Sequence, residues 1–297
     1  MTVRTVFLAD IGKSTTRVAL ARNGVIGTVL SGAGIPGLAE SGGARAAQAR
    51  IDALTPGLGS HAFHAVSVGA AGALSAPEAA EELARLLADR WSTPASVTSD
   101  VVAAHVGALD GEVGTILIAG TGAVALGVRD DGGFHLTDGL GPELGDHGSG
   151  YWIGRAGLRS TLRAGSETIL AARALEHLEH LDAPRWLAQQ EHPLAAVARF
   201  APVVLDCARS GDDVARGICD AAIRELTATT RDASSSGDRV SVLGGLASHA
   251  WFANRLRESL AQAGLRPEGA RGSAMDGALL IADRATLPHE RLIHRVL

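Results

Sequence analysis

Short apolar runs separated by glycine-rich turns dominate the first half of the chain, and this pattern predicts β-strands joined by tight turns. A first meander is predicted over 6–9, 16–21 and 25–30, with an Asn23-Gly24 hairpin before its last strand. A second is predicted over 113–118, 123–128 and 134–136. Because the second repeats the order of the first, we infer a weak internal duplication and two similar lobes, 1–109 and 110–297, with the last helix free to pack back on the N-terminal lobe.

Helical periodicity, together with helix-capping residues, predicts helices over most of the remaining chain. Helices are predicted over 44–54, 77–90, 101–109, 151–163, 167–178, 193–209, 212–232, 252–263 and 274–282. Three further short apolar runs predict strands over 64–68, 96–98 and 240–243. The tail from Pro288 gives no clear pattern. The fold class is therefore α/β.

Composition and charge argue against several classes of protein function. Hydrophobic residues make up 46% of the chain but aromatic residues only 3%, so Ala, Val and Leu must supply the core. The net charge of −5 is spread without a basic block, which argues against a nucleic-acid or membrane-surface partner. No apolar run approaches the length of a membrane span. Cys207 and Cys219 form neither a disulfide framework nor a metal pattern, so we expect small buried side chains in a cytoplasmic protein.

Three polar or glycine-rich segments directly follow predicted strands, where ligands gather in α/β sheets. They are the Asp10–Ser14 turn, Asp100 and the Gly120–Gly122 turn. Both turns can offer backbone N–H groups to phosphates, and Asp10 can hold Mg²⁺ through water. The structural alternatives are tight hairpins for the turns and a plain helix cap for Asp100.

Residues 138–154 are the most specific segment, because no folding requirement explains six glycines around Asp138, Glu143, Asp146 and His147. The segment runs into a predicted helix, whose first turn attracts anions or sugar hydroxyls. A cap for that helix is the alternative role of Asp146.

This segment resembles the GW-G-P-x-x-GDEGSGYWIGR signature of N-acetylglucosamine kinases. These belong to the BadF/BadG/BcrA/BcrD ATPase-like group of the sugar-kinase/actin/heat-shock-protein superfamily. Residues 10–17 resemble its DGGGTKT phosphate motif, 118–123 its SGTGS motif, 68–72 its IGxAG stretch and 242–245 its adenosine motif. The resemblance implies two actin-like (ribonuclease H-like) lobes with a central cleft for ATP and sugar.

The resemblance also implies an activity and a set of site residues. The activity is transfer of the ATP γ-phosphate to the 6-hydroxyl of an amino sugar, N-acetylglucosamine or glucosamine, with Asp100 as the general base and Mg²⁺ near Asp10. The implied ATP-binding residues are Asp10, Gly12, Lys13, Ser14, Gly120, Thr121, Gly122, Gly244, Gly245 and Ser248. The implied sugar-binding residues are Gly139, Leu140, Gly141, Glu143, Asp146 and His147.

Several positions depart from the family pattern. Lys13 replaces a phosphate-loop glycine, and its side chain either reaches a phosphate or points to solvent. Leu140 replaces a tryptophan, His147 a glutamate and Ala123 a serine. Glu143 stands where many relatives carry an apolar residue. A carboxylate there can pair with a free 2-ammonium group and favour glucosamine; the alternative is a solvated loop acid.

Two rival functions remain open at this point. One is an activator-type ATPase of the same group, which needs an iron–sulfur cluster held by cysteine thiolates across a dimer. The other is a nucleotide- or sugar-binding sensor without turnover. The sequence leaves the oligomeric state open, with a homodimer as one option.

Overall fold

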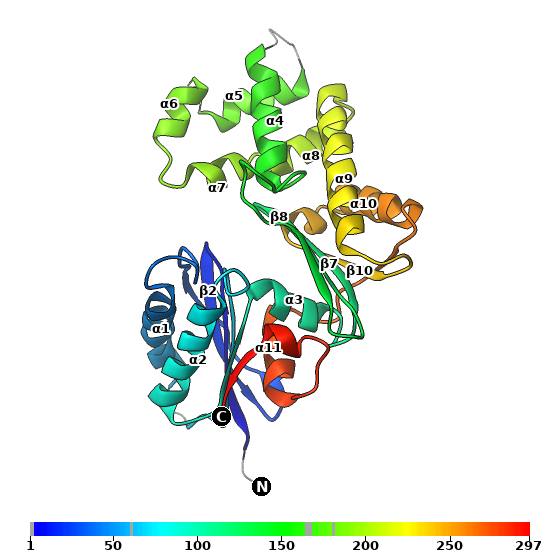
Figure 1. Cartoon of the computed structure of the whole chain (residues 1–297). Coiled ribbons are helices and arrows are strands. Elements are labelled where there is room, and N and C mark those ends of the chain that lie inside the picture. The colour runs from blue at the N-terminus through cyan, green and yellow to red at the C-terminus, as the bar shows by residue number, and fades with distance from the viewer. Residues whose placement is uncertain (1–2, 60–61, 164–167, 180–181) are drawn as a thin grey trace. The chain divides into compact units, whose positions relative to one another are not determined.

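The computed structural model describes residues 3–59, 62–163, 168–179 and 182–297 (Figure 1). The chain divides into two compact units, which are described separately below. Unit 1 comprises Met1–Val113, Val128–Gly133 and Ala270–Leu297, and unit 2 comprises Gly114–Gly127 and Phe134–Gly269. The predicted boundary after residue 109 stays a prediction, because compactness alone does not show that a unit folds independently.

Unit 1 is a twisted sheet with helices on both faces. Its strands are β1 (Thr5–Ile11), β2 (Thr15–Arg22), β3 (Val25–Ile26), β4 (Leu30–Ala33), β5 (Ala65–Ala70), β6 (Ala95–Thr98) and β12 (His294–Val296). Its helices are α1 (Gly43–Leu54), α2 (Pro77–Trp91), α3 (Asp100–Ala108) and α11 (Ala274–Asp283), with short 3₁₀ turns at Thr55–Leu58 and Glu290–Leu292. The strand order is β12-β6-β5-β1-β2-β3, and β4 also pairs with β2.

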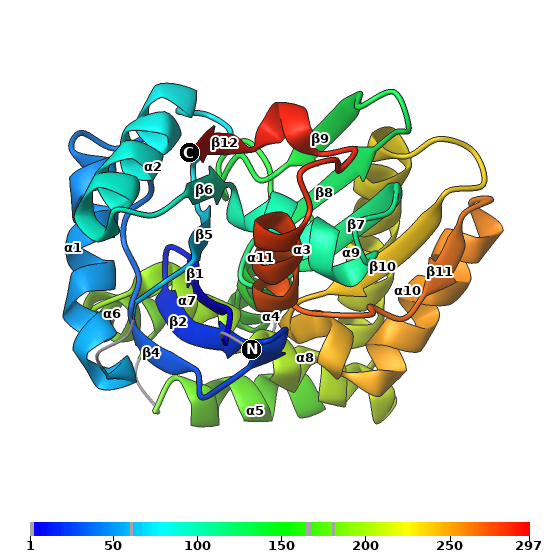
Figure 2. The ribbon, with the colours of Figure 1, turned by 90° about the horizontal axis from the view of Figure 1, so that it is seen from below.

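Strand β1 shows how the alternation of side chains builds two cores in unit 1. Phe7 and Ala9 face one cluster, which includes Leu83 of α2. Val6 and Leu8 face the opposite cluster, which includes Met275 of α11. All four strand residues are buried, as expected for a strand covered on both faces. Figure 2 shows α1 and α2 on one side of this sheet and α3 and α11 on the other.

Unit 2 combines a second sheet with a group of helices. Its strands, in spatial order, are β11 (Arg266–Glu268), β10 (Arg239–Leu243), β7 (Gly114–Ala119), β8 (Ala123–Val128) and β9 (Phe134–Asp138). Its helices are α4 (Gly150–Arg163), α5 (Ile169–His177), α6 (Ala183–Ala188), α7 (Pro193–Ala198), α8 (Ala201–Arg209), α9 (Asp213–Ala233) and α10 (Ala250–Gln262), with a 3₁₀ turn at Gly245–Ser248. Leu117 of β7, Leu226 of α9 and Phe200, which precedes α8, belong to one large core cluster of this unit.

The described residues correct two predicted elements. The strand predicted over 25–30 is wrong: β3 ends at Ile26, and the Gly27 N–H then donates to the Leu20 carbonyl oxygen at 2.9 Å before β4 begins. The helix predicted over 193–209 is wrong as well. It breaks between α7 and α8 because Pro202, in the first turn of α8, cannot continue a preceding helix.

Three other elements were not predicted from the sequence, and one predicted helix begins outside the described residues. The prediction contained neither α6, β11 nor β12. The predicted start of a helix at residue 167 lies outside the described residues, and α5 begins at Ile169. No helix in the described part of the chain combines the length and apolar composition needed to cross a membrane.

Candidate functional site

The β1–β2 turn of unit 1 carries the first group of predicted site residues. The Gly12 N–H donates to the Thr15 carbonyl oxygen at 2.9 Å and closes the turn. Lys13 and Ser14 stand exposed at its tip, and within the described residues their N–H groups donate to no other group. A Cβ added at Gly34 would lie 2.5 Å from the Lys13 carbonyl oxygen, so the following loop packs tightly against the turn. The turn is therefore braced, with two N–H groups and a hydroxyl available for a ligand.

Asp100 lies at the first position of α3, and it is not the cap of that helix. The cap is Ser99, whose hydroxyl oxygen accepts from the Val102 N–H at 3.1 Å. Among the described residues the Asp100 carboxylate accepts from the Val101 N–H, at 2.9 Å, and from its own backbone N–H, but from no side chain. The alternative that Asp100 serves as a plain helix cap is therefore wrong. The Asp100 carboxylate can therefore still accept further hydrogen bonds, including bonds from a ligand.

A glycine brings Asp100 close to the sheet of unit 1. Asp10 of β1 pairs in register with Gly69 of β5, and Gly69 with Thr98 of β6, so three parallel strands end at one edge. A Cβ at Gly69 would lie 2.8 Å from the Cβ of Ala103 and 3.4 Å from the Cα of Asp100. The missing side chain lets the start of α3 pack directly on β5.

Two carboxyl groups and two cations interact at this edge. The pKa of Asp100 is raised to about 6: burial, the largest cause, and the Asp10 carboxylate raise it, while the Val101 N–H and the Lys13 ammonium offset part of the rise. Burial also raises the pKa of Asp10, and Arg17 offsets part of that shift. Arg17, the cross-strand neighbour of Asp10, donates from Nη1 to Asp10 Oδ2 at 3.1 Å. A cation bound here would relieve the repulsion between the two carboxylates.

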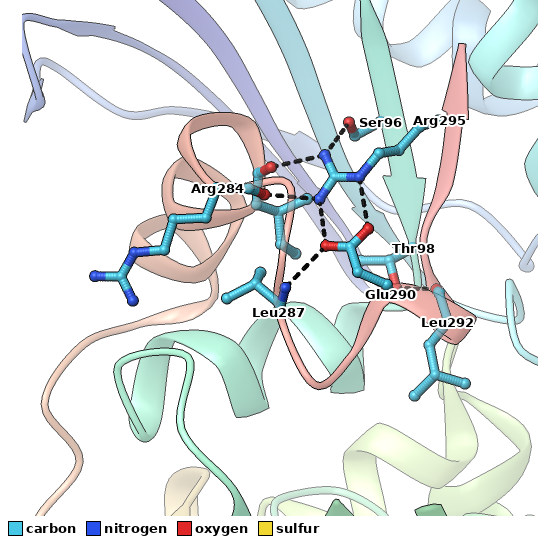
Figure 3. Close-up of polar contacts among 8 residues, drawn as sticks. Ser96, Thr98, Arg284, Leu287, Glu290, Leu292 and Arg295 are labelled. Carbon is cyan, nitrogen blue, oxygen red and sulfur yellow. Dashed lines mark hydrogen bonds and ion pairs between the residues drawn. The ribbon is translucent and has the colours of Figure 1, made fainter. Parts of the chain in front are cut away.

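The C-terminal segment supports β6, the strand that leads to Asp100. Arg295 donates to both carboxylate oxygens of Glu290, at 2.8 and 2.9 Å, and to Ser96 Oγ at 3.1 Å (Figure 3). Thr98 Oγ1 donates to the Leu292 carbonyl oxygen at 2.6 Å. These bonds hold β12 antiparallel to β6, so residues that gave no pattern in the sequence fix the approach to Asp100.

The Gly120–Gly122 turn of unit 2 is built like the β1–β2 turn of unit 1. The Gly120 N–H donates to the Gly122 carbonyl oxygen at 2.9 Å. Among the residues that the structure describes, the N–H groups of Thr121 and Gly122 donate to no other group. The Gly120 and Thr121 carbonyl oxygens accept from Gly150 and Tyr151, at 2.7 and 3.0 Å, so the start of α4 holds the turn in place.

The predicted adenosine segment lies beside this turn in unit 2. Strand β10 runs parallel to β7 with Leu243 opposite Ile118, so Gly244 follows at the same edge as Gly120. Gly244 has a φ of 93°, and a Cβ there would lie 2.5 Å from the Ala119 carbonyl oxygen. Gly245 has open space around its α-carbon, and Ser248 is exposed at the end of the 3₁₀ turn.

The glycine-rich loop after β9 is tied together by two aspartates. Asp138 accepts from the Asp146 N–H and, at 2.8 Å, from Thr229 Oγ1 of α9. Asp146 Oδ1 in turn accepts from the Ala123 N–H at 3.2 Å. Both aspartates have positive φ, 68° and 58°, which side-chain-bearing residues adopt at an energetic cost. A Cβ at Gly122 would lie 2.7 Å from Asp146 Oδ2, so only glycine lets this carboxylate reach the turn.

The other predicted sugar-binding residues lie on the same loop. Gly139 and Gly141 have φ values of 73° and 85°. Leu140, Glu143 and His147 are exposed, and His147 Nδ1 lies 4.0 Å from a Glu225 carboxylate oxygen. The alternative role of Asp146, as the cap of α4, is not what the described contacts show: the Trp152 N–H donates to Ser149 Oγ at 3.2 Å.

Each unit therefore gathers its own set of predicted residues. Unit 1 brings together Asp10, Lys13 and Asp100, and unit 2 brings together the Gly120–Gly122 turn, Asp146 and Gly244. The unbonded N–H groups of both turns fit the phosphates of ATP, and the paired carboxylates fit a hydrated Mg²⁺. Roles for Arg17 and Gly69 were not predicted, although a glycine inside a strand signals a close backbone approach.

Comparison with known proteins places this architecture among the actin-like ATPase folds. A protein from Chromobacterium violaceum, provisionally named an N-acetylglucosamine kinase, superposes with a TM-score of 0.75 at 26% identity, covering 94% of this chain and 99% of that one. A second, from Porphyromonas gingivalis and named in the same way, gives a TM-score of 0.74 at 19% identity over 95% and 100% of the two chains. The predicted α/β class is confirmed, whereas the predicted cleft stays a prediction.

The chain belongs to the BadF/BadG/BcrA/BcrD ATPase family, which it matches over residues 9–282. It is 32% identical over 137 residues to the N-acetylmuramic acid/N-acetylglucosamine kinase of Clostridium acetobutylicum, covering 44% of this chain and 45% of the relative. It is 30% identical over 146 residues to the N-acetyl-D-glucosamine kinase of Dictyostelium discoideum, covering 44% and 46%. The chain thus matches a little under half the length of these curated relatives.

Proposed function

We propose that the protein is an ATP-dependent hexosamine kinase that transfers the γ-phosphate to the 6-hydroxyl of an amino sugar. The observation that supports this most is the state of Asp100. Ser99 takes over the capping of α3, and among the described residues only the backbone N–H groups of Val101 and of Asp100 itself bond to the Asp100 carboxylate, so no side chain occupies it. Burial raises its pKa to about 6, so at neutral pH the group is an anion able to accept a proton.

The proposed chemistry divides between the described residues. Asp100 orients the sugar hydroxyl and accepts its proton as the oxygen attacks phosphorus. The N–H groups of Ser14 and Thr121, with their hydroxyls, bind phosphate oxygens, and Asp10 holds a water of the metal's shell. Bound Mg²⁺ supplies charge neutralisation on the phosphates. Gly244, Gly245 and Ser248 lie against the adenosine in this proposal.

The acceptor sugar is assigned to the loop after β9. The Asp146 carboxylate, held in position through Ala123 and Asp138, is proposed to accept hydrogen bonds from sugar hydroxyls. Both curated relatives are named as N-acetylglucosamine kinases, which supports an amino sugar. Glu143, exposed on the same loop, is proposed to select the free 2-ammonium group of glucosamine over the N-acetyl form.

The cysteines disfavour the activator-type ATPase. Cys207 in α8 and Cys219 in α9 are 3% and 0% exposed and form no disulfide. Burial raises the pKa of both thiols, that of Cys219 to about 12. A cluster shared across a dimer requires thiolates at the surface of each chain, whereas these are protonated groups inside the core of unit 2.

The test is a pair of neighbouring substitutions. Asp100→Asn keeps the size and hydrogen-bonding shape of the side chain but removes the proton acceptor. We expect calorimetry to show unchanged ATP binding, while sugar-dependent ATP consumption falls by a factor of about 10² to 10⁴. The matched control is Ser99→Ala, which removes the cap at a cost of about 1 kcal/mol of stability and leaves the carboxylate in place. Near-normal turnover in Asp100→Asn would refute the assigned base.

A further inference from the structure

Lys13 is the only lysine in the chain. Of the 27 lysine and arginine residues, 26 are arginine. Arginine therefore fills every other lysine-or-arginine position, from helix surfaces to the partly buried Arg295 network. A solvated cation without a particular task would be expected to be arginine here as well. The single lysine lies instead at the tip of the β1–β2 turn, at a position where the phosphate motif that this turn resembles has a glycine.

The surroundings of Lys13 combine a rigid backbone with an unpaired side chain. The Ile35 N–H donates to the Gly12 carbonyl oxygen and the Gly34 N–H to the Ser14 carbonyl oxygen, both at 3.2 Å. Within the described residues the Lys13 ammonium forms neither a hydrogen bond nor an ion pair. It nevertheless acts electrostatically on Asp100. The anchored turn thus carries a free positive charge beside the proposed base.

The two cations of this edge are not equivalent. Arg17 already pairs with Asp10 at 3.1 Å. No cation of the described residues pairs with Asp100. A second guanidinium at position 13 would present a planar fork that binds a carboxylate with two parallel hydrogen bonds. A lysine ammonium is a compact point charge that binds a phosphoryl oxygen without demanding that geometry.

We propose that Lys13 binds a phosphoryl oxygen of the nucleotide, and that lysine stands there because an arginine would engage the Asp100 carboxylate and block it as the base. The proposal rests on the proposed kinase function. In this proposal residue 13 binds the nucleotide, and the difference between an ammonium and a guanidinium group matters there as much as the positive charge.

The sole lysine allows a binding test that does not depend on turnover. Succinimidyl acetate acylates amines, and peptide mass mapping separates Lys13 from the α-amino group. With a saturating non-hydrolysable ATP analogue and Mg²⁺, we expect acylation of Lys13 to slow by about tenfold or more, because its ammonium is engaged by phosphate. A matched control is the double variant Lys13→Arg, Arg45→Lys. It carries its one lysine on α1, where the analogue should leave the labelling rate unchanged.

Substitutions at position 13 then separate charge from shape. Lys13→Met should weaken binding of the ATP analogue by about tenfold, since one charged contact is lost. Lys13→Arg should bind the analogue within about threefold of the wild type yet lose at least about tenfold in kcat, because the guanidinium engages the base.

The outcomes distinguish this inference from the proposed function. If calorimetry shows no binding of the ATP analogue to the wild type, both fail. If the analogue binds but Lys13 is acylated at the same rate with and without it, the role of Lys13 is overturned while the kinase proposal stands. A Lys13→Arg variant with wild-type kcat would overturn the stated reason for lysine.

Discussion

A pair of buried histidines, one on the Asp100 helix and one in the C-terminal segment, predicts a loss of stability in mild acid. His105 of α3 and His289 are both fully buried, and His289 Nε2 lies 2.8 Å from His105 Nδ1. Within the described residues the Nδ1 atom of His289 has no hydrogen-bond partner. Burial, and then the neighbouring His105, lowers the pKa of His289 from 6.5 to about 3. The folded protein therefore keeps this ring neutral where an unfolded chain would protonate it.

The sign and size of the effect follow from linkage. Because the folded pKa is depressed, the unfolded state binds the extra proton between pH 6.5 and about 3, so stability is lost as the pH falls from 6.5 toward 3. Between pH 7.5 and 5.5 the loss amounts to about 1.4 kcal/mol for this one group.

The assay is urea unfolding of the wild type and of His289→Leu at the two pH values. The variant removes the titrating ring, so its difference in unfolding free energy between pH 7.5 and 5.5 should be smaller than that of the wild type by about 1.4 kcal/mol. His192→Gln is the control, because the His192 side chain is 77% exposed and should leave the pH difference unchanged. Equal pH differences in the wild type and His289→Leu would show that the His289 ring is not kept neutral by the folded protein.

Two further predictions concern packing and the proposed base. A Cβ at Gly277 of α11 would lie 1.9 Å from the Ala103 carbonyl oxygen of α3, so Gly277→Ala should cost about 1–3 kcal/mol in a thermal-unfolding assay. Gly217→Ala on the open face of α9 should instead be neutral or stabilising by up to about 1 kcal/mol, and equal effects of the two would contradict the packing. Because burial raises the pKa of Asp100 to about 6 and the base must be ionised, kcat/KM should fall about tenfold per pH unit below pH 6. A flat profile down to pH 5 would contradict that role.

Local signals in the sequence predicted most of the elements. The β8 strand and the start of α2 at Pro77 lie where apolar runs and a helix-starting proline indicate them. The break at Pro202 was predictable from the same chemistry but was outweighed by the helical periodicity around it. Strand β12 could not be predicted, because it is short and exists through the Arg295–Glu290 pair and its pairing with β6.

The candidate site also contains residues that the sequence predicts and residues that only the fold reveals. Glycine turns and acids after strands can be found by pattern, and so Asp10, Asp100 and Asp146 were predicted. The pairing of Arg17 with Asp10 depends on strand register, and the capping of α3 by Ser99 depends on a shift of one residue at a helix end. Lys13 is distinguished by its composition and its surroundings together, because it is the sole lysine of the sequence and its ammonium is unpaired among the described residues of unit 1.

The most direct test of the central claim is ATP consumption measured with and without each member of a sugar panel. The panel contains glucosamine, N-acetylglucosamine, N-acetylmuramic acid, N-acetylmannosamine and glucose. We expect that Mg²⁺-dependent ADP release requires an amino sugar, that the product carries phosphate on the 6-oxygen, and that Glu143→Gln lowers the preference for glucosamine over N-acetylglucosamine. ADP release at the same rate without any sugar, or with glucose as the preferred acceptor, would contradict it.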